Sequence, residues 1–209
     1  MNLIILGPPG SGKGTQSRRI SLLYDNMSLI DCGSLLRSSP LNQDIKKDME
    51  GGNLIDDSIV CSTVGDEIFR LNSENKNFIL DGFPRSIAQC DALFQITDSL
   101  ELQISCVIKL QLCDSKIFER LSGRLICGSC GKLLESSSFC NFCGSDKKLR
   151  RVDDASVDSI KKRISVYRAF EADIIKSLRL KNLMIMSFDA SGSVDFITED
   201  IKSQLLIFA

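Results

Sequence analysis

A lysine inside a glycine-rich loop is the feature of this sequence with the most specific chemistry. Residues 7–15 read Gly-Pro-Pro-Gly-Ser-Gly-Lys-Gly-Thr, directly after an apolar run over residues 3–6 and before a segment with helical apolar spacing. Such a loop directs backbone N–H groups at one point, where the dipole of the following helix adds positive potential. Lys13 adds a charge that can reach the outer phosphates of a nucleotide. The predicted phosphate-binding residues are Gly10, Ser11, Gly12, Lys13, Gly14 and Thr15.

Four of the nine cysteines form two C-x-x-C pairs separated by nine residues, Cys127/Cys130 and Cys140/Cys143. Thiolates three positions apart on a tight turn can face one ion, and two such turns make a closed, structural Cys₄ zinc site. The surrounding segment has few apolar residues, so bound metal would supply folding free energy. Redox pairs and an iron–sulfur cluster are the alternatives, but nothing else in the sequence indicates electron transfer.

Composition excludes several other functions. The 209 residues carry a net charge of −1, which gives no overall attraction to nucleic acid or anionic membranes. No uninterrupted stretch of eighteen apolar residues occurs, and the first predicted strand starts at the N-terminus, so we expect neither a membrane span nor a signal peptide. The chain has no histidine, the usual general base. The other five cysteines are scattered singly, which favours a reducing, cytoplasmic location.

Predicted strands alternate with predicted helices along most of the chain, which is typical of a parallel sheet covered on both faces. The pattern is interrupted twice, at about residues 31–56 and 123–152. Within the first interruption, residues 42–50 are predicted to form a helix that ends at Gly51 and Gly52, and Ser193 is predicted to cap the last helix. The predicted strands cover residues 3–6, 27–30, 77–81, 105–112 and 183–188.

Further motifs match one family almost end to end. They are residues 33–37 (Gly-Ser-Leu-Leu-Arg), residues 81–85 (Asp-Gly-Phe-Pro-Arg) with Gln89, Gly123-Arg124, the cysteine pairs, residues 151–154 (Arg-Val-Asp-Asp) and Arg163. Together with the phosphate loop, they make the chain resemble adenylate kinases of the bacterial type with a zinc-binding lid. The resemblance implies an α/β P-loop nucleoside monophosphate kinase fold, with a doubly wound five-stranded parallel sheet in the order 2-3-1-4-5. It also implies a core of residues 1–30, 57–122 and 153–209, an AMP-binding insertion at 31–56 and a lid at 123–152.

The resemblance implies the reaction ATP + AMP ⇌ 2 ADP with Mg²⁺, in a protein that we expect to be a monomer. The implied ATP-binding residues are those of the phosphate loop with Arg120, Arg124, Leu133, Leu134 and Gly192. The implied AMP-binding residues are Cys32, Arg37, Asn53, Leu54, Ile55, Gly82, Phe83, Pro84, Arg85, Gln89, Arg151 and Arg163. The implied catalytic residues are Lys13, Asp81, Arg85, Arg124, Arg151 and Arg163.

The sequence departs from the family pattern at some positions. Cys32 replaces a threonine on the adenine side of AMP, and Ser34 stands where an acidic residue is common. Gly14 departs instead from the general phosphate-loop pattern, in which a serine or threonine follows the lysine. The spacing from Asp153 and Asp154 to Arg163 is one residue longer, and the two aspartates could instead serve as charges at a helix N-terminus. The alternatives are a UMP/CMP kinase, a GTP:AMP phosphotransferase or, more remotely, a non-catalytic nucleotide-binding zinc-ribbon protein.

Overall fold

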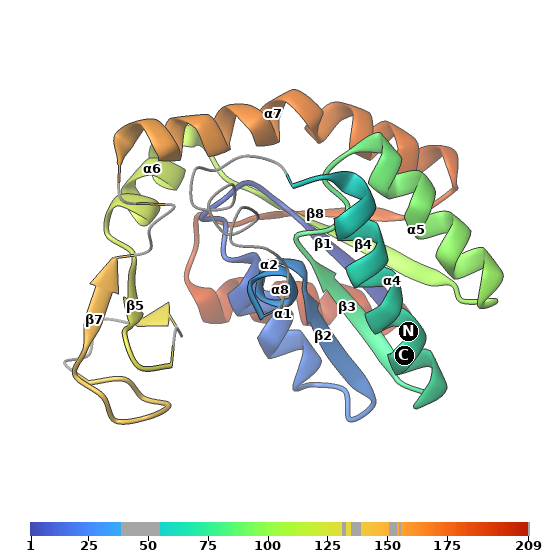
Figure 1. Cartoon of the computed structure of the whole chain (residues 1–209), viewed down its shortest axis with the longest axis horizontal. Coiled ribbons are helices and arrows are strands. Elements are labelled where there is room, and N and C mark those ends of the chain that lie inside the picture. Colours follow the sequence, from blue (N-terminus) through green and yellow to red (C-terminus); the bar gives the residue numbers. More distant parts are fainter. Residues whose placement is uncertain (39–54, 131–132, 135–138, 151–153, 155, 209) are drawn as a thin grey trace.

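The core of the protein, seen here in a computed structural model, is a five-stranded parallel sheet (Figure 1). The structure describes residues 1–38, 55–130, 133–134, 139–150, 154 and 156–208, so the helix predicted at 42–50 lies outside the described residues. The strand order β2-β3-β1-β4-β8 confirms the predicted α/β fold and the order 2-3-1-4-5, counted over the strands of this sheet. These strands are β1 (Asn2–Leu6), β2 (Met27–Asp31), β3 (Asn77–Asp81), β4 (Ile104–Gln111) and β8 (Ile185–Asp189).

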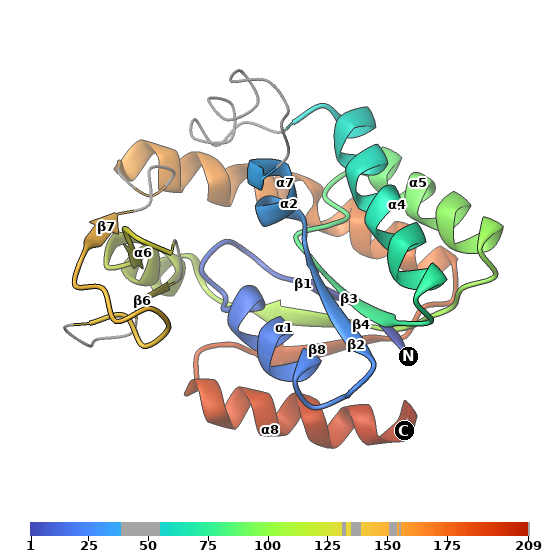
Figure 2. The same ribbon diagram turned by 60° about the horizontal axis from the view of Figure 1, so that its bottom comes forward.

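Helices cover both faces of this sheet (Figure 2). One face carries α1 (Lys13–Ser21) and α8 (Val194–Leu205), and the other carries α4 (Asp57–Ser73), α5 (Ile87–Ser99) and α7 (Val157–Leu180). Shorter elements complete the described chain: α2 (Cys32–Ser38), α6 (Asp114–Ser122) and a final 3₁₀ turn, η2 (Leu206–Phe208). Within the described ranges, none of the helices has the length and apolar character needed to cross a membrane.

The packing of β1 explains why residues 3–6 form a continuous apolar run. Leu3 and Ile5 pack into a core cluster with residues of α1 and α8, while Ile4 and Leu6 pack into a second cluster with residues of α4 and α5. A strand that is buried on both faces reads as a continuous apolar run rather than as an alternating one. The central strand is therefore fixed from both sides at the point where the phosphate loop leaves it.

Side-chain caps set the starts of four long helices. The side chains of Asp56, Ser86, Ser156 and Ser193 each accept a hydrogen bond from a backbone N–H in the first turn of α4, α5, α7 and α8, respectively. Such caps satisfy N–H groups that have no partner inside the helix. The structure confirms the predicted cap at Ser193.

A second, antiparallel sheet stands apart from the parallel one, on the left in Figure 1. Its strands β5 (Leu125–Cys127), β6 (Leu133–Leu134) and β7 (Lys148–Arg150) pair in the order β6-β5-β7, and we call them the small sheet. Sequence patterning did not predict these strands, because each has only two or three residues and most of them are exposed.

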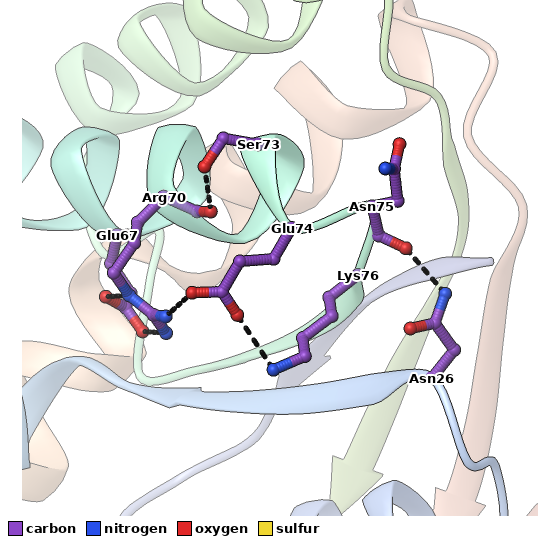
Figure 3. Close-up of polar contacts among 7 residues, drawn as sticks. All are labelled: Asn26, Glu67, Arg70, Ser73, Glu74, Asn75 and Lys76. Atoms are coloured by element: carbon purple, nitrogen blue, oxygen red, sulfur yellow. Dashed lines mark hydrogen bonds and ion pairs between the residues drawn. The ribbon is translucent and has the colours of Figure 1, made fainter.

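The end of α4 that is far from its N-terminal cap is held by polar contacts (Figure 3). The Arg70 guanidinium donates to both carboxylate oxygens of Glu67 and also contacts Glu74. Next to this network, Asn26 Nδ2 donates to the Asn75 carbonyl oxygen at 2.6 Å, which joins the turn before β2 to the turn before β3. These contacts lie at the amino ends of the strands, opposite the edge that carries the site.

Candidate active site

The candidate site lies at the carboxyl edge of the parallel sheet. Gly7 follows the last residue of β1, while Asp31, Asp81 and Asp189 end β2, β3 and β8. Asp31 lies opposite Asp81 in the register of β2 and β3, and Asp81 lies opposite Ile5 of β1. Open α/β sheets bind ligands in the crevice beyond the carboxyl ends of their strands.

The phosphate loop connects β1 to α1 and needs glycine for two separate reasons. Gly12, the N-cap of α1, has φ +90°, a left-handed conformation that side chains disfavour. A Cβ on Gly7 would stand 2.7 Å from Ser11 Oγ and 2.9 Å from the Leu110 carbonyl oxygen. Ser11 Oγ is buried and has no hydrogen-bond partner among the described residues. A buried hydroxyl without a protein partner, beside a helix N-terminus, suits an anionic ligand.

Lys13 is the cationic centre of the loop. Its Nζ donates to the carbonyl oxygens of Gly7, at 2.7 Å, and Pro8, at 3.0 Å. Burial lowers the pKa of Lys13 to about 8; the Asp81 carboxylate opposes this shift, and the positive charges of Arg85, Arg163 and Arg124 add to it. Several cations thus surround one lysine, an arrangement that a bound polyphosphate would stabilise.

Asp81 explains the unusual glycine after the lysine. The Asp81 side chain is buried, and its Oδ2 would lie 3.2 Å from a Cβ added to Gly14. A serine or threonine at this position would press on the carboxylate. Burial raises the pKa of Asp81, and the charge of Lys13 opposes that rise.

Arg85 is placed by the loop that leaves β3. The Phe83–Pro84 peptide bond is cis, and Phe83 is fully buried. Arg85 Nε donates to the Gly82 carbonyl oxygen at 2.7 Å. Gly82 has φ +80°, and a Cβ there would lie 2.8 Å from Arg85 Nη2, so this position accepts only glycine without displacing the guanidinium.

Helix α2 carries a second arginine, Arg37, in its last turn. Arg37 Nη2 donates to Ser34 Oγ at 3.3 Å, and this hydroxyl in turn donates to Asp31 Oδ2 at 2.6 Å. Cys32 is 3% exposed, and burial raises the pKa of its thiol to about 11. Cys32 therefore presents a neutral thiol at neutral pH, which is a weak hydrogen-bond donor.

Asp154 joins two arginines that are distant in sequence. Its carboxylate is fully buried and accepts from Arg124 Nε at 2.6 Å on one oxygen and from Arg163 Nη1 on the other. Arg124 precedes β5 of the small sheet, and Arg163 lies on α7 beyond it. Nearby, Arg120 Nη1 lies 3.4 Å from the Gly10 carbonyl oxygen of the phosphate loop. Asp154 thus joins the segment before the small sheet, through Arg124, to helix α7, through Arg163.

The four paired cysteines converge in the segment that holds the small sheet. Their Sγ atoms all lie within 4.8 Å of one another, with Cys127 and Cys143 at 3.6 Å and Cys130 and Cys140 at 3.5 Å. Four thiolates about 2.3 Å from a tetrahedral zinc ion are about 3.8 Å apart, so the donor set fits that metal. The Cys130 backbone N–H lowers the pKa of the Cys127 thiol to about 6, which favours the thiolate that binds metal. Gly144, with φ +70°, makes the turn after the second pair.

Comparison with known proteins decides the family. The profile of the family described as "Adenylate kinase" matches residues 5–182. The chain belongs to the adenylate kinase family. Curated proteins named adenylate kinase are similar over nearly the whole chain. One from Wolbachia sp. subsp. Drosophila simulans is 38% identical (98% of each chain), one from Caldicellulosiruptor bescii is 34% identical (97% of this chain, 98% of the other), and one from Methanosarcina mazei is 33% identical (100% of each).

The remaining residues implied by resemblance to adenylate kinases are scattered around this edge. Gly192 lies in the turn between β8 and α8, and Ile55 is half-buried against the cluster that includes α4. Leu133 and Leu134 form β6 of the small sheet, paired with β5. Arg151, Asn53 and Leu54, also implied for the adenylate kinase site, lie outside the described residues.

Sequence reasoning did not assign Asp154 a place in the site of this adenylate kinase family member. The paired aspartates fitted equally well as charges at a helix N-terminus, but α7 begins at Val157 with Ser156 as its cap. Asp154 instead lies two positions before that cap and is fully buried between two arginines. The available signal was an acidic residue between the motifs of Arg124 and Arg163. The sequence pattern alone does not show which residues bind a carboxylate.

Proposed function

We propose that this member of the adenylate kinase family transfers the terminal phosphoryl group of ATP to AMP and releases two ADP. The observation that carries the proposal is the set of cations around Lys13. The positive charges of Arg85, in the loop after β3, and of Arg124 and Arg163, which lie before and after the small sheet in sequence, all lower the pKa of Lys13. Cations arriving from two sides suit two phosphorylated substrates that meet at the loop, whereas a site for one nucleotide needs only one such set.

The residue roles are those that the resemblance to adenylate kinases implies, and we propose them for this chain. Lys13, Arg120 and Arg124 would bind the ATP phosphates, while Arg37 and Arg85 would bind the AMP phosphate. Arginine suits both tasks because its planar guanidinium can form two parallel hydrogen bonds to a phosphate. Arg163, with Arg151, would contact the phosphoryl group in transfer. In this scheme, residues 31–56 form the AMP-binding insertion, residues 123–152 form a lid over ATP, and the rest of the chain is the core.

The chemistry needs no general base, because the AMP phosphate that attacks is already an anion. Phosphoryl transfer depends on positioning and on neutralising charge, which a lysine and several arginines around one loop supply. Mg²⁺, when bound with ATP, would neutralise part of the phosphate charge. Asp81 fits a role toward that ion, because its buried carboxylate lies against Gly14 at the edge of the phosphate loop.

Zinc is the metal that we propose for the four cysteines. Two of them, Cys127 and Cys140, are almost fully buried, and Cys130 and Cys143 are exposed; the four thiolates match the four positions of a tetrahedral ion. A closed all-thiolate set is typical of structural zinc. We also propose a cytoplasmic location, because each of the nine cysteines, all within the described residues, is without a disulfide. The expected monomeric state stays a prediction.

The test is ADP formation from Mg-ATP with AMP, CMP, UMP or GMP offered separately, beside a reaction without acceptor. The proposal expects rapid ADP formation with AMP and a rate near the control with the pyrimidine nucleotides. Preferred transfer to CMP, UMP or GMP would reassign the acceptor site. ADP formation at the control rate with every acceptor would refute the proposed activity.

A further inference from the structure

Asp57, the first residue of α4, makes two hydrogen bonds that the proposed chemistry does not use. Its Oδ1 accepts from Gln89 Nε2 at 2.7 Å, and its Oδ2 accepts from Ser86 Oγ, also at 2.7 Å. Both donors belong to the start of α5, about thirty positions further along the chain. Asp57 therefore ties the point where the chain returns from residues 31–56 to the helix that follows Arg85.

The second contact of Gln89 leads to Arg85 itself. Gln89 Oε1 accepts from the Arg85 backbone N–H at 2.7 Å. The Gln89 amide is thus engaged at both ends, and its side chain is 3% exposed, so water does not replace either partner. In the reversed orientation, the NH₂ group would face the Arg85 N–H and the carbonyl oxygen would face a carboxylate. Both pairings are repulsive. The Asp57 carboxylate and the Arg85 N–H therefore favour the orientation in which Nε2 faces Asp57 and Oε1 faces the Arg85 N–H.

We propose that Asp57 is a positioning residue for the phosphoryl acceptor, because it fixes the Gln89 amide in one orientation and keeps the Arg85 loop against the start of α4. The inference rests on the proposed function, in which Arg85 binds the AMP phosphate, and it takes the implied contact of Gln89 with AMP to be a contact with the base. Asp57 itself touches neither nucleotide in this scheme and acts through Ser86 and Gln89. Removing its carboxylate should therefore change acceptor recognition while the ATP side is left as it was.

A fixed amide also distinguishes between purine bases. Its remaining N–H and its remaining lone pair present a donor and an acceptor in a set order. Adenine offers a 6-amino donor beside a ring-nitrogen acceptor, whereas hypoxanthine offers a 6-oxo acceptor beside a ring N–H donor, which is the opposite order. A Gln89 amide that can flip by about 180° can present its donor and acceptor in either order and so can pair with either base. Loss of Asp57 should thus weaken discrimination between AMP and IMP, an effect that reduced stability alone does not produce.

The chain supplies a matched control at the neighbouring position. Asp56 is also an acid at the start of α4, but it is exposed and its side chain accepts from the Ser58 backbone N–H within its own helix. Asp56→Ala removes the cap of α4 and leaves the contacts to Ser86 and Gln89 in place. Asp57→Asn supplies a conservative variant, since its carboxamide oxygen can accept from Gln89 Nε2 while its NH₂ group donates to Ser86 Oγ.

The experiment measures KM for AMP, KM for ATP and the AMP/IMP ratio of kcat/KM in wild type, Asp57→Ala, Asp57→Asn and Asp56→Ala. For Asp57→Ala we expect KM for AMP to rise by about tenfold or more, with KM for ATP unchanged and a lower AMP/IMP ratio. Asp57→Asn should recover most of both losses, and Asp56→Ala should show neither.

The possible results separate this inference from the proposed function. A wild-type protein that does not phosphorylate AMP refutes the proposed function itself. A wild type that phosphorylates AMP, with Asp57→Ala equal to Asp56→Ala in acceptor KM and in the AMP/IMP ratio, overturns the role of Asp57 alone. Equal increases in KM for AMP and ATP would also overturn it, because they would show a general structural defect. If Asp57→Ala does not fold, Asp57→Ser carries the same comparison.

Discussion

Nucleotide binding should take up a proton at mildly alkaline pH, because of the environment of Lys13. The pKa of Lys13 is lowered to about 8 in the free protein, chiefly by burial. A bound polyphosphate places negative charge beside Nζ and should return the pKa toward the ordinary range near 10. The free lysine is then about 90% charged at pH 7 and about 10% charged at pH 9. If the charged form binds, the apparent Kd for ATP rises about tenfold between these pH values.

The sign of the effect follows from the proton balance. Between pH 8 and the pKa of the complex, the complex binds more protons than the free protein, so rising pH disfavours binding. Isothermal titration with ATP, in buffers of different ionisation enthalpy, should show uptake of about half a proton at pH 8 and about 0.8 at pH 9. Lys13→Arg, which stays charged throughout this range, is the control and should bind without proton uptake from this position. A wild-type Kd that is flat from pH 7 to 9, or uptake that persists in Lys13→Arg, would refute the reasoning.

Three further changes test other parts of the site. Cys127→Ser should lower the zinc content below about one ion per chain and reduce Tm. Cys113→Ser, at a cysteine outside the cluster, should leave both the zinc content and Tm unchanged. An unchanged zinc content in Cys127→Ser would show that the thiolates are not the ligands. Asp154→Ala leaves two arginines, each about one-fifth exposed, without their shared carboxylate, so we expect a loss of about 3 kcal/mol and a Tm lower by about 10 °C in thermal unfolding; an unchanged Tm would contradict the pairing. Gly82→Ala places a Cβ 2.8 Å from Arg85 Nη2 at φ +80°, so KM for AMP should rise while KM for ATP stays the same, and equal increases in both would count against it.

The strands of the parallel sheet could be predicted because their signals are local and strong, whereas their order was implied by the resemblance to adenylate kinases. Strand β1 is apolar on both faces, and Gly7 and Lys13 mark the loop that follows it. The sequence therefore predicts the strand, the loop and the start of α1. The cysteine pairs were similarly legible, since the spacing of ligands on a tight turn sets the geometry of the ion they face. In each case, residues close in sequence determine the feature.

The parts that could not be predicted depend on contacts between distant residues. Asp154 meets Arg124 across thirty positions, and Asp57 meets Gln89 across thirty-two, and neither pairing leaves a periodic signal. The small sheet was missed for a different reason. Its strands are two or three residues long and exposed, so the turns of the cysteine pairs, rather than burial, determine where they form.

The contact of Asp154 with Arg124 and Arg163 bears on how the proposed lid, residues 123–152, can vary in length. Arg124 precedes β5 and Asp154 follows β7, so one carboxylate closes the base of this segment. The distance across that base is set by two hydrogen-bonded pairs and is independent of how many residues lie between them. Insertions or deletions beyond the base, in the turns of the small sheet, would therefore leave the arginines beside the phosphate loop where they are. The length of the proposed lid can therefore change while Arg124 and Arg163 keep their positions.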